Sequence, residues 1–276
     1  MTPAAFVYRR ASSVSEAIKF LVDFGDEAKA LAGGHSLLPI MKLRMSTPAV
    51  VIDLDSIRGL DYIRREGGDI AIGALARHAD LEDSDLLAAG VPLLKRTAAS
   101  VGDPQIRHRG TLGGSVAHGD PAADLPAALM ALGATLVAEG PSGRRSISID
   151  DFYRGFLQTV LAPDELLVEV RVPWVGQRGW SFQKFRRRSL DWAIVGVAHQ
   201  VFETGAGIGL VNMGQTTVRA RAAEKALRDG AAPQAVAALA DADTAPATDG
   251  TATSAYRRDL ARVLLHRALV EAKGAR

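Results

Sequence analysis

The chain has 276 residues, 47% of them hydrophobic and 23% charged, and a formal net charge of +2. This composition is ordinary for a globular protein, and the near-neutral charge gives little support to nucleic-acid binding. With no cysteine, disulfides, thiolate catalysis and cysteine-held iron–sulfur clusters are excluded from this chain. No apolar run approaches the roughly 20 residues of a transmembrane helix. The N-terminus has no signal-peptide pattern, so we expect a cytoplasmic location.

The first part of the chain predicts strands alternating with helices. Ser13 and Glu16 have the spacing of a capping box, which predicts that a helix starts at Val14. Strands are expected at residues 6–8, 30–32 and 50–54, and helices at 14–24 and 37–45. We therefore predict a first unit over residues 1–57.

The middle of the chain changes to strands in succession, followed by helices and more strands. Gly67 and Gly68 form the expected turn of the first hairpin. Strands are expected at residues 62–65, 69–73, 135–138, 145–149 and 166–172, and helices at 77–87, 92–101 and 124–132. A second unit over residues 58–175 follows from this pattern.

Proline and glycine mark residues 173–179 as a linker. Beyond it we expect strands at residues 181–186, 193–202 and 208–213, then helices at 219–228, 233–240 and 256–273. Three strands followed by helices predict an α+β domain over residues 176–276.

Two glycine-rich segments carry most of the functional information. Ala32-Gly33-Gly34-His35-Ser36 and Thr111-Leu112-Gly113-Gly114-Ser115 each hold a Gly-Gly pair followed by polar residues. Adjacent glycines allow successive backbone N–H groups to point at one anion. Two such segments suggest a diphosphate held from two sides, as in a dinucleotide cofactor, although each segment could also be an ordinary tight turn. The dinucleotide fingerprint GxGxxG is absent from both, and residues 205–209 are interpreted as a hairpin turn.

Three histidines near these segments are open to more than one interpretation. His35 could act as a base, donate to a phosphate, attach a flavin covalently or cap local backbone. His108 and His118 have the same status. No pair of histidines has the spacing of zinc ligands, so no metal site is expected.

Asp124 and Trp192 are the other candidates for cofactor contact. Asp124 follows the second segment closely and could accept from ribose hydroxyls, or serve as a first-turn carboxylate of the helix beginning there. Trp192 begins an expected strand, where it could pack in the core or lie against a flat heterocycle.

Several segments together resemble the flavoprotein subunit of molybdenum-containing hydroxylases, and most closely the medium subunit of aerobic carbon monoxide dehydrogenases. The matching segments are ALAGGHSLLPIMKLRM (residues 30–45), DPQIRHRGTLGG (103–114), TLGGSVAHGDPAADLP (111–126), PDELLVEVRVP (163–173) and PATDGTATSAYRRDLARVLLHRAL (246–269). The two Gly-Gly motifs in this order and spacing are specific for the family, and much less so for its substrate.

The resemblance implies the vanillyl-alcohol-oxidase-type fold, in which two α+β subdomains bind FAD non-covalently and a third domain follows. It implies that residues 32–36 and 111–115 hold the diphosphate, that Asp124 binds the adenosine end, and that Leu161 and Lys184 lie along the cofactor. Trp192 stands where the subgroup has a tyrosine near the isoalloxazine. The full set of implied FAD contacts is Ala32, Gly33, Gly34, His35, Ser36, Leu37, Val101, Thr111, Gly113, Gly114, Ser115, His118, Asp124, Leu161, Lys184 and Trp192.

The resemblance also implies two partners: a large subunit with the molybdopterin cofactor and a small subunit with two [2Fe–2S] clusters. FAD on this chain would then pass electrons onward, within a dimer of heterotrimers. A self-sufficient flavin oxidase or dehydrogenase of the same fold is the alternative, and a non-enzymatic nucleotide-binding module fits only the glycine segments. The sequence does not distinguish carbon monoxide, a purine or an N-heterocycle as substrate, or quinone, NAD or oxygen as acceptor.

Overall fold

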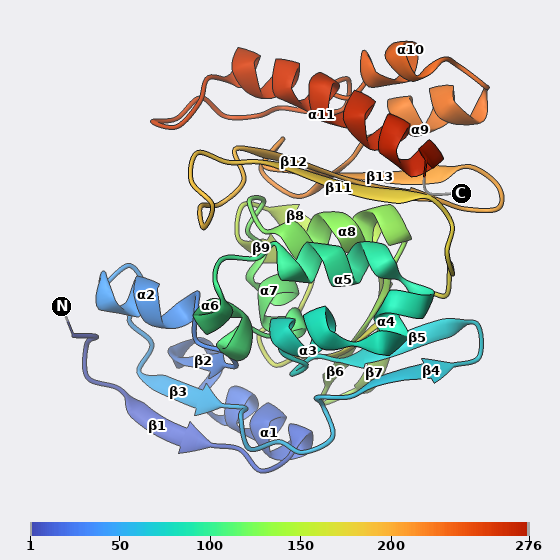
Figure 1. The fold of residues 1–276 in the computed structure, drawn as a ribbon. Coiled ribbons are helices and arrows are strands. Elements are labelled where there is room, and N and C mark those ends of the chain that lie inside the picture. The colour runs from blue at the N-terminus through green and yellow to red at the C-terminus, as the bar shows by residue number, and fades with distance from the viewer. Residues whose placement is uncertain (1, 275–276) are drawn as a thin grey trace.

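The computed structural model describes residues 2–274, which form the three successive α+β regions seen in Figure 1. The first region has a parallel sheet of order β1-β3-β2. Its strands are β1 (Val7–Arg10), β2 (Ala28–Leu31) and β3 (Val50–Asp53), joined by α1 (Val14–Phe24), the 3₁₀ turn Gly25–Glu27 and α2 (Leu37–Lys42). Ser13 caps α1 by accepting from the Glu16 N–H at 3.1 Å, which confirms the predicted helix start.

The second region has an antiparallel sheet of order β4-β5-β10-β6-β7. Its strands are β4 (Ile63–Glu66), β5 (Asp69–Gly73), β6 (Thr135–Gly140), β7 (Gly143–Ser148) and β10 (Leu166–Pro173). Six helices connect β5 to β6: α3 (His78–Asp83), α4 (Asp85–Gly90), α5 (Pro92–Ala99), α6 (Pro104–Arg109), α7 (Leu112–His118) and α8 (Asp124–Leu132). A small hairpin, β8 (Tyr153–Gly155) and β9 (Gln158–Thr159), follows the 3₁₀ turn Ile149–Asp151.

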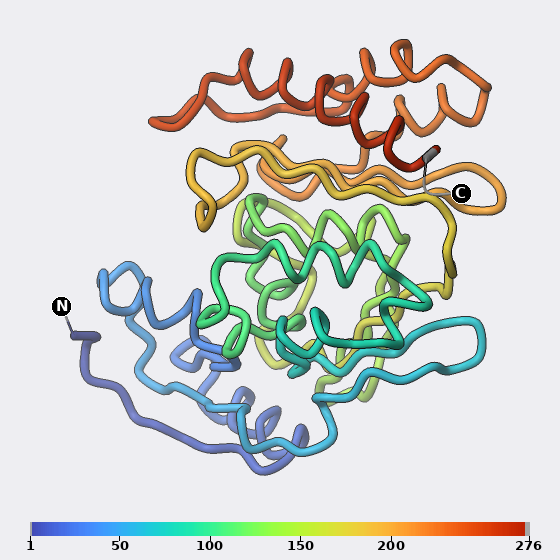
Figure 2. The backbone as a smooth tube through the Cα atoms, in the orientation of Figure 1, coloured from blue at the N-terminus to red at the C-terminus, as the bar shows by residue number. Residues whose placement is uncertain are grey.

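The third region is a four-stranded antiparallel sheet covered by helices on both faces (Figure 1). Its strands are β11 (Trp180–Phe185), β12 (Val195–Val201), β13 (Ala206–Val211) and β14 (Val218–Arg219). Helices α5 and α8 contact one face, and α9 (Arg221–Arg228), α10 (Pro233–Ala237) and α11 (Ser254–Gly274) lie beyond the other. The backbone trace in Figure 2 shows the chain rising to this upper layer after β10, when the second sheet is complete.

Glycines let this third sheet approach α8 closely. A Cβ on Gly207 or Gly209 would lie less than 3 Å from the carbonyl oxygens of Ala131 and Ala127 of α8. The expectation that residues 205–209 form a turn is therefore wrong beyond Gly205, because the later glycines belong to a strand that packs on a helix backbone.

Five further differences from the sequence-based prediction concern local elements. The helix expected at 77–87 is interrupted at Ser84, whose extended backbone ends α3 while its hydroxyl caps α4. Helix α6, the β8–β9 hairpin and the short strand β14 were not predicted. Helix α2 ends at Lys42, earlier than expected, because the chain turns at Arg44, which has a φ of +60°.

The hydrophobic core is continuous across the second and third regions. The largest cluster of buried residues includes Leu94, Leu125 and Leu129 below the third sheet and also Ala198 and Val211 of that sheet. The third region is thus packed onto the second by apolar side chains rather than tethered by a linker. Among residues 2–274, no helix combines the length and apolarity needed to cross a bilayer.

Candidate functional site

The first glycine segment connects β2 to α2 and has unused backbone donors. Gly34 has a φ of +81°, a left-handed conformation that favours glycine. Within residues 2–274, no acceptor lies in hydrogen-bond range of the backbone N–H of Gly33, Gly34, His35 or Ser36. Successive free N–H groups around a left-handed residue are suited to binding an anion.

The two glycine segments, about eighty residues apart in the sequence, meet in the structure. A Cβ on Gly33 would lie less than 3 Å from the carbonyl oxygen of Arg109, two residues before the second segment. A Cβ on Gly114 would lie 3.7 Å from the Cβ of Ala32. The tertiary fold therefore brings together the two motifs that the sequence singled out.

The second segment differs from the loop that we expected. Thr111 is the N-cap of α7, and the Gly-Gly pair lies in the first turn of that helix. The N–H groups of Leu112 and Gly113 donate to the carbonyls of Ala76 and Ala74 at 2.9 and 2.8 Å. Those of Gly114 and Ser115 donate to the hydroxyl and carbonyl of Thr111. The expectation of a second set of free N–H donors is wrong, because the fold already uses them.

Burial divides the second segment into structural and accessible residues. Thr111 and Gly113 are buried, and Gly113 packs against Ala74 of the chain after β5. Gly114, Ser115 and His118 are half-buried and remain accessible. The segment can therefore offer a close backbone approach at Gly114 and the side chains of Ser115 and His118.

Three residues that the sequence did not indicate support the junction between the segments. Arg77 donates to the Arg109 carbonyl at 2.5 Å and forms an ion pair with Asp55. His78 is buried, and its Nε2 lies 3.1 Å from the Thr111 carbonyl. Burial lowers the pKa of His78 to about 4, with the Thr111 contact opposing that shift. No sequence signal marks these contacts, since each joins residues that are distant in the chain.

Asp124 and Lys184 form a buried ion pair between the start of α8 and β11. Their Oδ2 and Nζ atoms are 2.5 Å apart, and Lys184 also donates to the Ser100 carbonyl at 3.1 Å. Burial raises the pKa of the Asp124 carboxyl, and the Lys184 ammonium opposes that shift. The second carboxylate oxygen of Asp124 is buried and has no partner among residues 2–274, so it can still accept a hydrogen bond.

Trp192 does not begin a strand and does not pack in the core. It lies in the loop between β11 and β12, and 62% of its surface is exposed. The core interpretation of this tryptophan is therefore wrong. The ring is available to a flat ligand or to another protein surface.

The remaining predicted FAD contacts adjoin the glycine segments and the Asp124–Lys184 pair. Val101 follows Ser100, next to the carbonyl that binds Lys184, and Leu161 follows the β8–β9 hairpin. Both are half-buried, as is Leu37 at the start of α2, whereas His35 is exposed. Gly119, which ends α7, accepts from the Leu157 N–H at 3.3 Å, so the hairpin adjoins the end of the second segment.

The chemistry of these residues fits FAD. Four free N–H groups suit a diphosphate, the unpartnered Asp124 oxygen suits a hydroxyl or N–H donor, and the exposed Trp192 suits a flat ring. The structure therefore offers complementary groups for the anionic, polar and aromatic parts of such a cofactor.

Residues 4–175 match the family described as the FAD binding domain in molybdopterin dehydrogenase. The chain belongs to this family. The remainder, residues 180–272, matches the carbon monoxide dehydrogenase flavoprotein C-terminal domain. The chain is thus a flavoprotein subunit of a molybdenum-containing oxidoreductase, which confirms the resemblance and the FAD cofactor that the sequence indicated.

Relatives in this family match nearly the whole chain. The carbon monoxide dehydrogenase medium chain of Afipia carboxidovorans is 41% identical over 99% of this chain and 98% of its own length. The 6-hydroxypseudooxynicotine dehydrogenase complex subunit alpha of Paenarthrobacter nicotinovorans is 40% identical over 99% and 96%. A solved carbon monoxide dehydrogenase from Hydrogenophaga pseudoflava superposes with a TM-score of 0.96 at 41% identity, covering 100% of this chain and 99% of the other, which confirms the fold class.

Proposed function

We propose that this subunit binds FAD non-covalently and relays electrons from the [2Fe–2S] clusters of a small partner subunit to an external acceptor. The observation that carries the proposal is the set of free N–H groups at residues 33–36, placed beside Gly114 in a chain of this family. Bound FAD supplies chemistry that accepts electrons singly and releases them as a pair.

Each group of residues has a distinct role in this proposal. Residues 33–36 bind the diphosphate through backbone N–H groups, and Gly33 and Gly114 allow the close approach. Asp124 and Lys184 orient the cofactor through the unpartnered carboxylate oxygen, with Asp124 toward the adenosine end. Trp192 stacks on the isoalloxazine. Residues 1–57 and 58–175 form the two parts that hold FAD, and residues 176–276 present Trp192.

The redox partners lie on other chains in this proposal. The large subunit carries molybdopterin, the small subunit carries the clusters, and the complex is a cytoplasmic dimer of heterotrimers. Relatives named for carbon monoxide and for 6-hydroxypseudooxynicotine are about equally similar to this chain, at 41% and 40% identity. This equality supports a role in which the large subunit, and not this chain, selects the substrate, with carbon monoxide among the candidates.

The experiment is a comparison of the lone FAD-loaded chain with the complex obtained by co-expressing the neighbouring genes. Flavin reduction by carbon monoxide or an N-heterocycle, followed anaerobically by absorbance, should occur only in the complex. Rapid reduction in the lone chain would instead establish the alternative, a self-sufficient flavin dehydrogenase.

The mode of attachment has its own test. His35 is exposed. In this proposal it lies in the segment that binds the diphosphate, and not beside the ring methyl that a covalent bond would need. Acid precipitation should therefore leave FAD in the supernatant. Yellow colour in the washed pellet would show covalent attachment.

A further inference from the structure

The backbone that carries Trp192 becomes buried directly after the tryptophan. Ala193 and Ile194, directly after the tryptophan, are 2% and 6% exposed, whereas Leu190, shortly before it, is 57% exposed. The change from an exposed ring to a buried backbone takes place within one residue. This burial removes the backbone carbonyls of Ala193 and Ile194 from water, so each needs a hydrogen-bond donor from the protein.

Asn212 binds the first of these carbonyls. Its Nδ2 donates to the Ala193 oxygen at 3.0 Å, and its own backbone N–H donates to the Pro121 carbonyl at 2.7 Å. Asn212 has a φ of +61°, a left-handed conformation that asparagine tolerates better than most residues. It therefore links the Trp192 segment to the chain just before Asp124.

Arg257 binds the second carbonyl. Its guanidinium donates to the Ile194 oxygen at 2.5 Å, and only 1% of the residue is exposed. Asp249 at 2.7 Å and Thr251 at 3.0 Å hold the other end of the guanidinium. Asp249 and Thr251 belong to the segment at residues 246–269. That segment contributed to the family resemblance, but the sequence alone indicated no function for it.

We propose that Asn212 and Arg257 are positioning residues, which fix the backbone after Trp192 so that its ring is oriented before the cofactor binds. This inference rests on the proposed contact between Trp192 and the isoalloxazine. Two consecutive carbonyls held by side chains from separate elements leave that backbone little freedom. A ring fixed in advance loses less conformational entropy on binding, and the affinity for FAD rises accordingly.

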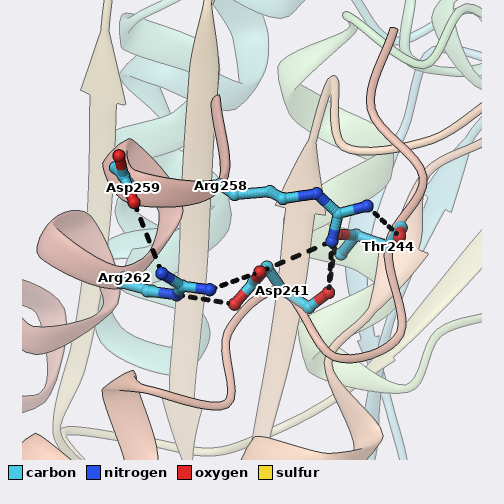
Figure 3. A network of polar contacts seen from close by, with 5 residues as sticks. All are labelled: Asp241, Thr244, Arg258, Asp259 and Arg262. Carbon is cyan, nitrogen blue, oxygen red and sulfur yellow. Dashed lines mark hydrogen bonds and ion pairs between the residues drawn. The ribbon is translucent and has the colours of Figure 1, made fainter. Parts of the chain in front are cut away.

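Two substitutions remove the donors. Asn212→Gly keeps the left-handed backbone and loses the amide. Arg257→Met loses the guanidinium, and its partner Asp249 has a side chain that is 48% exposed and can be hydrated. The control is Arg262→Met on the same helix, α11, because Arg262 binds Asp241 and Asp259 and has no contact with the Trp192 segment (Figure 3).

Fluorine NMR of the full chain labelled with 5-fluorotryptophan reads the ring directly. The three tryptophans give three resonances, and Trp192→Phe assigns the one of interest. Without FAD, both test variants should shift and narrow the Trp192 resonance, and the control should not. With FAD, the test variants should raise Kd by about threefold to tenfold, as expected when one side chain must be ordered on binding.

The outcomes separate this inference from the proposed function. An unchanged Trp192 resonance and an unchanged Kd in both test variants would overturn it, as would equal changes in the Arg262→Met control. If FAD leaves the Trp192 resonance of the unsubstituted chain unmoved, the ring contact fails. The positioning of Trp192 is then still decided by the spectra without FAD.

Discussion

A Cβ on Gly33 would lie less than 3 Å from the carbonyl oxygen of Arg109, closer than real Cβ atoms come. Arg77 donates a hydrogen bond to that same carbonyl at 2.5 Å. The first glycine segment is therefore pressed against a fixed backbone at the junction with the second. The close contact between the two segments therefore depends on the absence of a Cβ at Gly33.

We expect Gly33→Ala to lower both the FAD content and the melting temperature, because the added methyl group must separate the two segments. The control is Gly68→Ala in the β4–β5 turn, where an added Cβ meets no atom within 4 Å. FAD per chain is measured from the absorbance of the purified protein. A full flavin complement in Gly33→Ala would contradict the assignment of this segment.

Gly113→Val is expected to damage folding as well as flavin binding. A Cβ on Gly113 would lie less than 3 Å from both the side chain and the backbone of Ala74, in the core below α7. The yield of folded protein and its melting temperature should fall even when FAD is supplied in excess. Normal stability together with flavin loss would show that Gly113 touches the cofactor rather than the core.

We expect Trp192→Ala to weaken FAD binding with little change in the free energy of unfolding. Since the residue is 62% exposed, the free energy of unfolding without FAD should change by less than about 0.5 kcal/mol. Loss of stacking should weaken FAD binding by about 0.5–1.5 kcal/mol and increase flavin fluorescence. Titration of the apoprotein with FAD measures both, and unchanged affinity and fluorescence would exclude the ring contact.

Lys184→Met should destabilise the chain by about 3–5 kcal/mol, because it leaves the buried Asp124 carboxylate without its cation. The double variant Asp124→Asn, Lys184→Met should recover part of that loss. Denaturant unfolding of the single and double variants gives the coupling between the two residues. Additive effects would show that the ion pair contributes little.

Stability should fall as the pH drops from about 6.5 toward 4. Burial lowers the pKa of both His78 and His199 to about 4, against an ordinary value of 6.5, so in this range the unfolded chain binds more protons than the folded one. Each group contributes a slope of at most about 1.4 kcal/mol per pH unit. Unfolding curves between pH 4 and 7 should become flatter in the variant His78→Gln, His199→Leu.

Local signals were enough to predict several elements from the sequence. The Ser13 cap, the alternating strands and the helix beginning at Asp124 depend on residues only a few positions apart. Local residue patterns therefore predict them. The two Gly-Gly motifs could be recognised in the sequence for the same reason, and their combination by itself indicated a dinucleotide cofactor. Glycine composition also shows where a backbone can approach a ligand or another element, although not which of the two it approaches.

Only the tertiary structure decided which of those glycine segments keeps its donors free. The N–H groups of residues 33–36 have no acceptor within residues 2–274, whereas those of Leu112 and Gly113 are taken by Ala76 and Ala74, more than thirty residues away. The Asp124–Lys184 pair and the exposure of Trp192 were likewise decided by contacts between distant segments. No local sequence pattern predicts such contacts, because the packing of whole sheets and helices determines which groups meet.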